Sequence, residues 1–383
     1  MKLELTPEQR ALRAEVRDFV DRDVAPHAGE WDRAEALPRE VVDKLVERGW
    51  LGSIVPAEHG GKGLDMVSYG ILNEELGRGC SSTRSLLTVH DMVCQGILRW
   101  GSKPQREKYL GRLAKGEVLG AFALSEPGAG SDAKGIATVA VSADAADTAD
   151  GGFVLNGAKK WITYGQIADL FLLFAQLDGK PTAFLVERDT PGFSSTPLRG
   201  LLGTRASMLA ELRLEDVRVP AEAMVGRPGF GVSHVMGAAL EQGRYSVACG
   251  SVGIAQACLE ACLSYARDRI QFEKPLFDHQ LVRAMLSDMI TGVRAARLLC
   301  MRAGYLRDVG HPDSSAETML AKYFASTTAA KAATDAVQIH GANGCHEDFA
   351  VSRYFRDAKV MEIIEGSTQI QQLTIARFEF PEL

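Results

Sequence analysis

The residue with the clearest capacity for chemistry is Glu365, in the segment IIEGSTQIQ (residues 363–371). It follows two β-branched apolar residues and directly precedes Gly366. A carboxylate in apolar surroundings has a raised pKa, which would let it act as a general base near neutral pH. A solvated glutamate before a helix can show the same tripeptide, so the meaning of Glu365 depends on other segments.

Four earlier segments carry residues that could bind a ligand: FALSEPGAGSD (122–132), KKWITYG (159–165), RDRIQFEKPL (267–276) and QIHGANG (338–344). In order and spacing, the five segments together resemble the acyl-CoA dehydrogenase family. The resemblance extends from LTPEQRALRAEVRDFV near the N-terminus to QIQQLTIAR near the C-terminus. It implies a flavoprotein oxidoreductase that binds FAD and acts on CH–CH groups of acyl thioesters.

The candidate flavin site is not of the Rossmann type, because no GxGxxG follows a strand pattern. Instead, Gly128 and Gly130 would let the backbone approach a ligand closely, and nearby serines offer hydroxyl groups. The resemblance implies flavin contacts from Phe122, Leu124, Ser125, Gly130, Ser131, Trp161, Ile162 and Thr163, and further cofactor contacts from Ser367 and Gln369.

A second set of residues is implied by the resemblance to reach the flavin of a neighbouring subunit. Ala342 departs from the family pattern, which usually has a second glycine at this position. Because these residues act across an interface, the resemblance implies a homodimer or a dimer of dimers. The set consists of Arg269, Phe272, Gln280, Gln338, Ile339 and Gly341.

The implied reaction starts with removal of the α-proton of a thioester, which needs a placed base and a stabilised enolate oxygen. The resemblance assigns the base to Glu365, whose backbone N–H would polarise the thioester carbonyl together with a flavin hydroxyl. The β-hydrogen would then leave as hydride to flavin N5. Some family members take the base instead from the residue before an arginine on a long helix. Here that arginine is Arg244 and the preceding residue is Gly243, so this alternative base is absent.

Arg84 bears on the substrate. Its segment CSSTRSLLTVHDMV (80–93) resembles the stretch in which glutaryl-CoA dehydrogenases place an arginine against a distal carboxylate, and it also resembles members that serve polyketide extender-unit pathways. An apolar acyl chain needs no arginine, and an unpaired buried cation is costly. We therefore expect a short polar or acidic acyl group, unless Arg84 is a surface helix-capping charge. The predicted substrate contacts are Arg84, Ser131, Arg244, Tyr245 and Gly366.

Several functional alternatives stay open from the sequence. The acyl carrier could be CoA or an acyl carrier protein, and a hydroxyacyl group on a carrier protein is one alternative substrate. A flavin oxidase or monooxygenase on the same fold is another, and a flavin-binding scaffold without activity is disfavoured by Glu365. The expected electron acceptor is an electron-transfer flavoprotein or another acceptor.

Bulk properties limit the partners of this 383-residue chain. Its net charge of −6 does not favour nucleic acid or an anionic membrane, and we expect neither a membrane span nor a signal peptide. The seven cysteines include no CxxC pair, so buried thiols are expected and no metal site. These features predict a reduced, cytoplasmic protein.

The elements that must position these residues fall into three stretches. Residues 1–118 are predicted to be helical, starting at a capping box of Thr6 and Gln9 and including helices over 69–76 and 85–100. Residues 119–228 are predicted as a small β-barrel or sandwich, with a hairpin at Asp178-Gly179. Residues 229–383 are predicted as a four-helix bundle, with a long helix over 232–271 and a capping box at Ser314 and Glu317.

Overall fold

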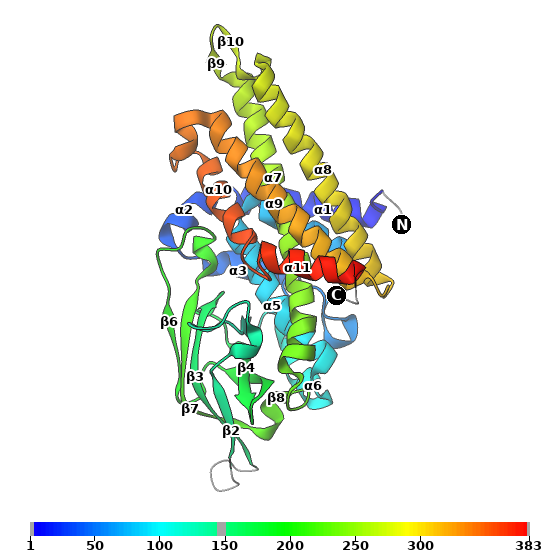
Figure 1. Ribbon diagram of the computed structural model, residues 1–383, viewed down its shortest axis with the longest axis vertical. Coiled ribbons are helices and arrows are strands. Elements are labelled where there is room, and N and C mark those ends of the chain that lie inside the picture. The colour runs from blue at the N-terminus through cyan, green and yellow to red at the C-terminus, as the bar shows by residue number, and fades with distance from the viewer. Residues whose placement is uncertain (1–3, 144–150, 381–383) are drawn as a thin grey trace.

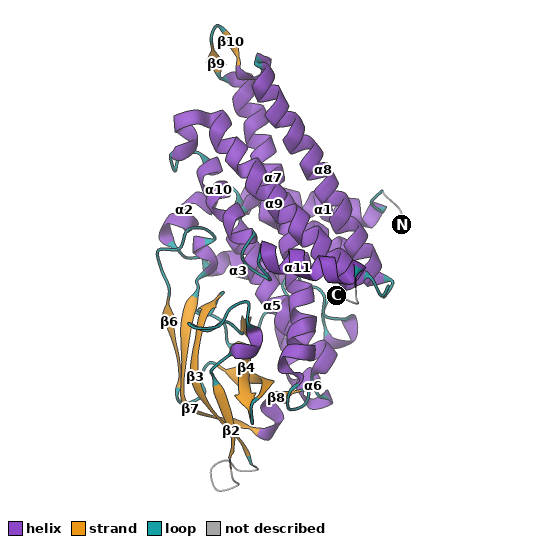
Figure 2. Ribbon diagram, in the orientation of Figure 1, coloured by secondary structure: helices purple, strands orange, loops and turns teal. Residues whose placement is uncertain are grey.

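The computed structural model describes residues 4–143 and 151–380, which form helices, then a sheet, then helices again (Figures 1 and 2). The first helices are α1 (Pro7–Phe19), α2 (Ala28–Ala34), α3 (Arg39–Glu47), α4 (Met66–Gly79), α5 (Ser81–Trp100) and α6 (Lys103–Ala114). The sheet strands are β1 (Gly120–Ala123), β2 (Val139–Ala143), β3 (Gly152–Ile162), β4 (Leu170–Leu177), β5 (Lys180–Glu187), β6 (Phe193–Pro197), β7 (Ala210–Pro220) and β8 (Met224–Val225). The last block is α7 (Gly237–Asp268), the hairpin β9 (Ile270–Gln271) and β10 (Lys274–Pro275), α8 (Gln280–Asp308), α9 (Ser314–His340), α10 (Ala350–Met361) and α11 (Thr368–Glu379).

The N-terminal helices begin as predicted. The Thr6 hydroxyl accepts a hydrogen bond from the Gln9 backbone N–H at 3.2 Å, and the Gln9 side chain accepts one from the Thr6 N–H at 3.1 Å. This confirms the capping box at the start of α1. Helix α5 starts at Ser81, four residues before the predicted position, which brings Arg84 into its first turn.

The middle of the chain is one mixed sheet with the strand order β6-β7-β3-β2-β4-β5-β8, and β1 pairs with β4. The predicted hairpin at Asp178-Gly179 is confirmed, since both residues have positive φ values and connect the antiparallel strands β4 and β5. Strand β1 runs parallel to β4 and is followed by the segment that carries Ser125 and Ser131.

The C-terminal block is built around α7, which packs against α4, α5, α8 and α9. A π-helical turn at Gly231–Met236 leads into α7, which ends at Asp268 instead of Gln271. The continuous helix Gly231–Asp268 is long and apolar enough to cross a membrane. However, 78% of its most apolar 18-residue stretch is buried inside the protein, which is typical of a core helix.

The capping box predicted at Ser314 and Glu317 is wrong. Asp313 is the residue that precedes α9, and its side chain makes no capping hydrogen bond. Glu317 instead forms an ion pair with Arg302 on α8 at 2.9 Å. The contact with the neighbouring helix therefore outweighs the local capping pattern. The predicted fold class, helical at both ends with a β-domain between, is confirmed.

Candidate active site

Glu365 lies in the turn between α10 and α11, and it adopts a left-handed backbone conformation with φ of 55°. The residue is half-buried, and its Oε2 atom is sealed from solvent without a hydrogen-bond partner among the described residues. Burial raises the pKa of this carboxyl to about 7, against the opposing charges of Arg244, Lys322 and Arg84. The carboxyl is therefore desolvated, but the predicted apolar setting is present only in part, because Ile363 is 58% exposed and three cations act on the carboxylate.

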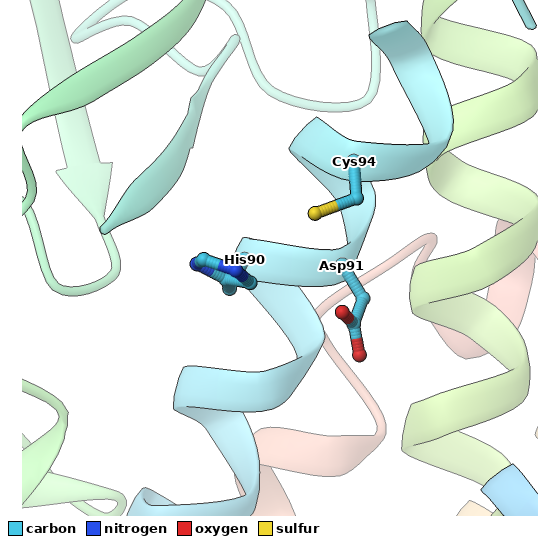
Figure 3. Close-up of side chains that lie close together, drawn as sticks. All are labelled: His90, Asp91 and Cys94. Atoms are coloured by element: carbon cyan, nitrogen blue, oxygen red, sulfur yellow. The ribbon is translucent and has the colours of Figure 1, made fainter. Parts of the chain in front are cut away.

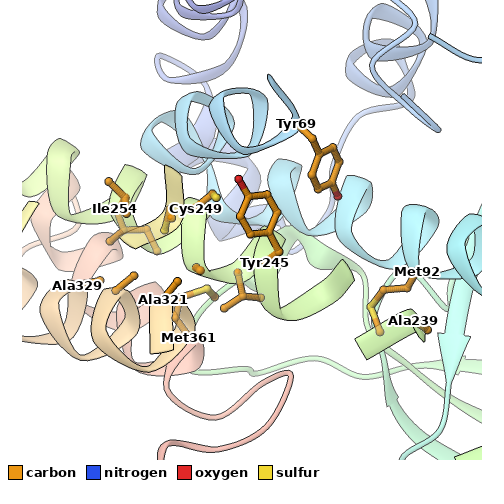
Figure 4. Packing of buried hydrophobic residues seen from close by; sticks show 14 of the residues in the cluster. Tyr69, Met92, Ala239, Tyr245, Cys249, Ile254, Ala321, Ala329 and Met361 are labelled. Atoms are coloured by element: carbon orange, nitrogen blue, oxygen red, sulfur yellow. The ribbon is translucent and has the colours of Figure 1, made fainter. Parts of the chain in front are cut away.

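Gly243 on α7 makes room for this carboxylate. A Cβ atom at position 243 would stand 2.6 Å from Glu365 Oε2 and 2.8 Å from Met92 Sδ. Any side chain there would displace the Glu365 carboxylate or Met92, which Figure 4 shows facing Ala239. A base at position 243 and a base at position 365 would therefore compete for one space.

The backbone of the Glu365 turn is held by side chains from three helices. Arg244 on α7, a predicted substrate contact, donates from Nε to the Glu365 carbonyl at 3.2 Å. Gln371 on α11 donates to the same carbonyl at 3.1 Å. Lys322 on α9 donates to the Gly366 carbonyl at 2.6 Å. Sequence reasoning missed Gln371 and Lys322; the available signal for Lys322 was a lysine on the buried face of an alanine-rich helix.

Tyr245, also predicted to bind substrate, points into the packing of α4, α7 and α8. A Cβ on Gly70 or on Gly304 would stand within 2.6 Å of its hydroxyl. Its ring stacks on Tyr69 with centroids 6.4 Å apart (Figure 4). The structure thus brings Arg244 and Gly366 to the base, and it places the Tyr245 hydroxyl among helix-packing contacts.

Arg84 is fully buried, so the alternative of a surface capping charge is wrong. Its guanidinium donates to Thr88 Oγ1 at 2.7 Å and to Ser85 Oγ at 3.2 Å, while Nε has no partner. No carboxylate forms an ion pair with Arg84 within the described residues, and burial lowers its pKa. A buried cation without an anion is expensive unless a ligand provides the counter-charge.

Further polar groups extend from Arg84 into the helical core. Thr88 Oγ1 lies 2.5 Å from Ser246 Oγ on α7, and Ser246 donates to Asn73 on α4 at 2.6 Å. These hydroxyl and amide groups form a buried, hydrogen-bonded polar line between α4, α5 and α7.

The segments predicted to hold a flavin ring lie at an exposed end of the sheet, where strands β1 and β3 finish (the sheet edge). Trp161 at the end of β3 has a φ of 64° and leaves 52% of its surface exposed. A Cβ at Gly128 or Gly130 would meet nothing within 4 Å, and Ser131 is exposed. A flat aromatic face, open backbone and hydroxyl groups fit a fused-ring cofactor with polar edges.

A buried ion pair stabilises this end of the sheet. Lys159 Nζ on β3 lies 2.6 Å from the Glu126 carboxylate, and the Lys160 N–H donates to the Ser125 carbonyl at 2.9 Å. Phe122 and Leu124 lie under the edge, with the Phe122 ring 5.2 Å from that of Phe174, and Ile162 is buried in the sheet core. Thr163, next to Ile162, is half-buried.

The second predicted set lies at the other end of α7 (Figure 1). Arg269 ends α7, Phe272 is 88% exposed on the β9–β10 hairpin, and Gln280 starts α8. The segment with Gln338, Ile339 and Gly341 joins them at this end, because His340 stacks on Tyr265 at 4.1 Å. Figure 1 shows the β9–β10 hairpin and the sheet at opposite ends of the molecule, so within one chain the two sets do not meet. Ser367 and Gln369 lie instead at the start of α11, beside the Glu365 turn.

One cluster outside this site has metal-ligand residue types: His90, Asp91 and Cys94 on α5 (Figure 3). Both ring nitrogens of His90 are already used, since Nδ1 accepts from the Gly120 N–H at 3.2 Å and Nε2 lies 3.1 Å from the Leu113 carbonyl. Burial raises the pKa of Asp91 well above its usual range and so favours the neutral acid. This cluster is therefore packed as core.

Comparison with known proteins gives the same assignment over the whole chain. Three family models match: the acyl-CoA dehydrogenase N-terminal domain at residues 6–117, the middle domain at 121–217 and the C-terminal domain at 229–380. A probable acyl-CoA dehydrogenase of Bacillus subtilis, YngJ, is 40% identical over 98% of this chain and 99% of its own length.

Solved structures agree with these relatives. A glutaryl-coenzyme A dehydrogenase in complex with glutaryl-CoA superposes with a TM-score of 0.94 at 36% identity, covering 100% of this chain and 97% of that one. A Mycobacterium smegmatis glutaryl-CoA dehydrogenase in complex with FADH2 superposes with a TM-score of 0.91 at 31% identity. The match covers 97% of this chain and 94% of that one. FkbI, a protein for biosynthesis of a methoxymalonyl polyketide extender unit, superposes with a TM-score of 0.86 at 36% identity. The match covers 96% of this chain and 99% of that one. The chain belongs to the acyl-CoA dehydrogenase family of FAD-binding oxidoreductases.

Proposed function

We propose that this protein is an FAD-dependent acyl-thioester dehydrogenase in which Glu365 is the catalytic base. The observation that carries the proposal is the Oε2 atom of Glu365, which is sealed from solvent beside Gly243 and has no hydrogen-bond partner among the described residues. The pKa of the Glu365 carboxyl is about 7. A base with a pKa near the working pH is ionised often enough to act and basic enough to accept a proton.

In the proposed reaction, Glu365 Oε2 takes the α-proton of the thioester. The Glu365 backbone N–H makes no turn or loop hydrogen bond among the described residues, so it is available to the thioester carbonyl. When bound, FAD would supply the hydride-accepting chemistry at the β-carbon, so that the Cα–Cβ bond would become a double bond. The sheet edge around Ser131 and Trp161 would hold the ring, and the line of groups around Arg84 would receive the distal end of the acyl group.

The substrate we propose is a short acyl group with a polar or acidic end. The buried Arg84 without a carboxylate partner supports it, and so does the similarity to a glutaryl-CoA dehydrogenase. The similarity to FkbI supports a second candidate, in which a polar or hydroxyacyl group is attached to an acyl carrier protein. Electrons would pass to an electron-transfer flavoprotein or another acceptor. We also propose the cytoplasm as its location.

The proposal is tested by anaerobic bleaching of the bound FAD. Wild-type protein should be yellow and should bleach with at least one of glutaryl-CoA, butyryl-CoA and matched acyl groups on a carrier protein. Glu365→Gln should keep the FAD and slow the bleaching by about 10²–10⁴-fold, because the amide keeps the shape but cannot accept the proton. Bleaching of this variant at a rate within a few-fold of wild type would place the base elsewhere.

A further inference from the structure

Two consecutive carbonyl groups in the turn that carries Glu365 receive an unusual number of donors. Glu365 and Gly366 both have positive φ values, 55° and 95°. This conformation is unfavourable for a residue with a side chain. The carbonyls of the pair accept from Arg244, Gln371 and Lys322, each of which comes from a different helix. The turn is therefore held in its strained form from three sides.

Lys322 is the least expected of these donors. Its side chain is fully buried on α9, in a row of small residues that includes Ala321 and Ala325. The only hydrogen bond of its ammonium among the described residues goes to the Gly366 carbonyl, and no carboxylate lies within ion-pair distance. An apolar side chain of similar volume would fill the space without the cost of burying a charge.

We propose that Lys322 is a positioning residue for the catalytic base: it fixes the Gly366 carbonyl so that the Glu365 side chain points into the space left by Gly243, and it supplies positive charge beside that carboxylate. The inference rests on the proposed role of Glu365. It adds a residue that touches neither the substrate nor the cofactor.

The charges around the turn support this role. Three cations face Glu365: Arg244 on α7, Lys322 on α9 and Arg84 on α5. Burial raises the pKa of Glu365 and the three cations lower it, and the net result is a pKa of about 7. The negative charge of Glu241 on α7 favours the charged form of Arg244, and that of Glu362 after α10 favours the charged form of Lys322. Burial lowers the pKa of Lys322 to about 8, so its ammonium is still charged at neutral pH. Removing that charge must make Glu365 harder to ionise.

The test is an infrared titration of the Glu365 carboxyl in the FAD-loaded enzyme, with the spectrum of Glu365→Gln as the blank. This readout needs no substrate, so it is separate from the bleaching test of the base. We expect Lys322→Gln and Lys322→Met to move the midpoint upward by about one pH unit, a tenfold change in the ionisation equilibrium. Lys322→Arg, which keeps the charge, should move it back towards the wild-type value.

The matched control is Lys331→Met on the same helix, since the Lys331 side chain is 60% exposed and pairs with Asp335. Its midpoint should equal that of wild type. A wild-type midpoint in folded, FAD-loaded Lys322→Gln and Lys322→Met would overturn the proposal. Loss of folding or of FAD in both variants would also overturn it, because Lys322 would then be a structural residue.

Discussion

At the scale of single residues, the proposed site contains the half-buried Glu365 carboxylate and the buried Arg84 guanidinium, neither of which forms an ion pair within the described residues. Glu365 keeps a free Oε2, and Arg84 keeps a free Nε. They do not neutralise each other through an ion pair within the described residues. Each is therefore able to act on a ligand, the one as a base and the other as a counter-charge.

The base predicts the pH dependence of catalysis. Because burial raises the pKa of Glu365 to about 7, the ionised form that accepts the α-proton is lost as the pH falls below about 7. The rate of anaerobic FAD reduction at saturating substrate should rise with pH and level off above about 8. At pH 6 it should be roughly tenfold below the plateau. A rate that is flat between pH 5.5 and 8 would contradict the assignment, and stopped-flow absorbance measures it.

Arg84→Leu should separate acidic from neutral substrates. If Arg84 pairs with a substrate carboxylate in its desolvated surroundings, its loss should cost about 2–5 kcal/mol in kcat/KM for an acidic acyl thioester. For a straight-chain acyl thioester of equal length, the same change should be neutral or favourable. Arg99→Leu, at an exposed position of the same helix, is the control and should alter neither value. Equal, small effects of Arg84→Leu on both substrates would remove the argument for a polar acyl group.

At the scale of elements, the sequence predicted features that local chemistry controls and missed those that depend on neighbouring helices. The capping box at Thr6 and the hairpin at Asp178-Gly179 are correct because each is closed by residues a few positions apart. The capping box at Ser314 is wrong because Glu317 pairs with Arg302 on another helix. The domain boundaries after residues 118 and 228 stay predictions.

The same distinction applies to the site. The motif IIEGSTQIQ singled out Glu365 through residues adjacent in sequence, and the family resemblance implied its role as the base, which stays a prediction. The lysine that holds the next carbonyl is 44 positions from Gly366, and it lies in a part of α9 outside the motif QIHGANG. Long-range contacts of this kind follow from helix packing and cannot be read from spacing.

Close packing between α4 and α7 predicts which glycines are structural. A Cβ on Gly253 of α7 would stand 2.1 Å from the Glu74 carbonyl of α4, so Gly253→Ala must push the helices apart. We expect a loss of about 1–3 kcal/mol in the free energy of unfolding. Gly237→Ala on the same helix meets nothing within 4 Å and should be neutral or stabilising by up to about 1 kcal/mol. Denaturant unfolding measures both, and equal effects would contradict the packing argument.

At the scale of the whole molecule, the two predicted cofactor regions lie in different parts of the structure. Trp161 belongs to the sheet, whereas Arg269 and Phe272 lie at the end of α7, on the hairpin that Figure 1 shows far from the sheet. Phe272, at 88% exposure, has too few contacts in its own chain for a phenylalanine in water. We therefore predict that each FAD is bound between two chains, with one FAD per chain, in a homodimer or a dimer of dimers.

A shared site predicts complementation between two inactive variants. Glu365→Gln lacks the base in its own chain, and Arg269→Ala/Phe272→Ala lacks the contacts offered to the neighbouring chain. In a mixed dimer, the site that has Glu365 from the second variant receives intact Arg269 and Phe272 from the first. That site should bind FAD and react, whereas both sites of each homodimer fail. We expect the co-expressed mixture, purified through two different tags, to reach up to about half of the wild-type rate per chain at limiting FAD.

The control is each variant carrying both tags, which should stay inactive under the same conditions. If the mixed dimer is no more active than these controls, or if the Arg269→Ala/Phe272→Ala homodimer holds FAD as tightly as wild type, the exposed hairpin does not contribute to the site of its neighbour.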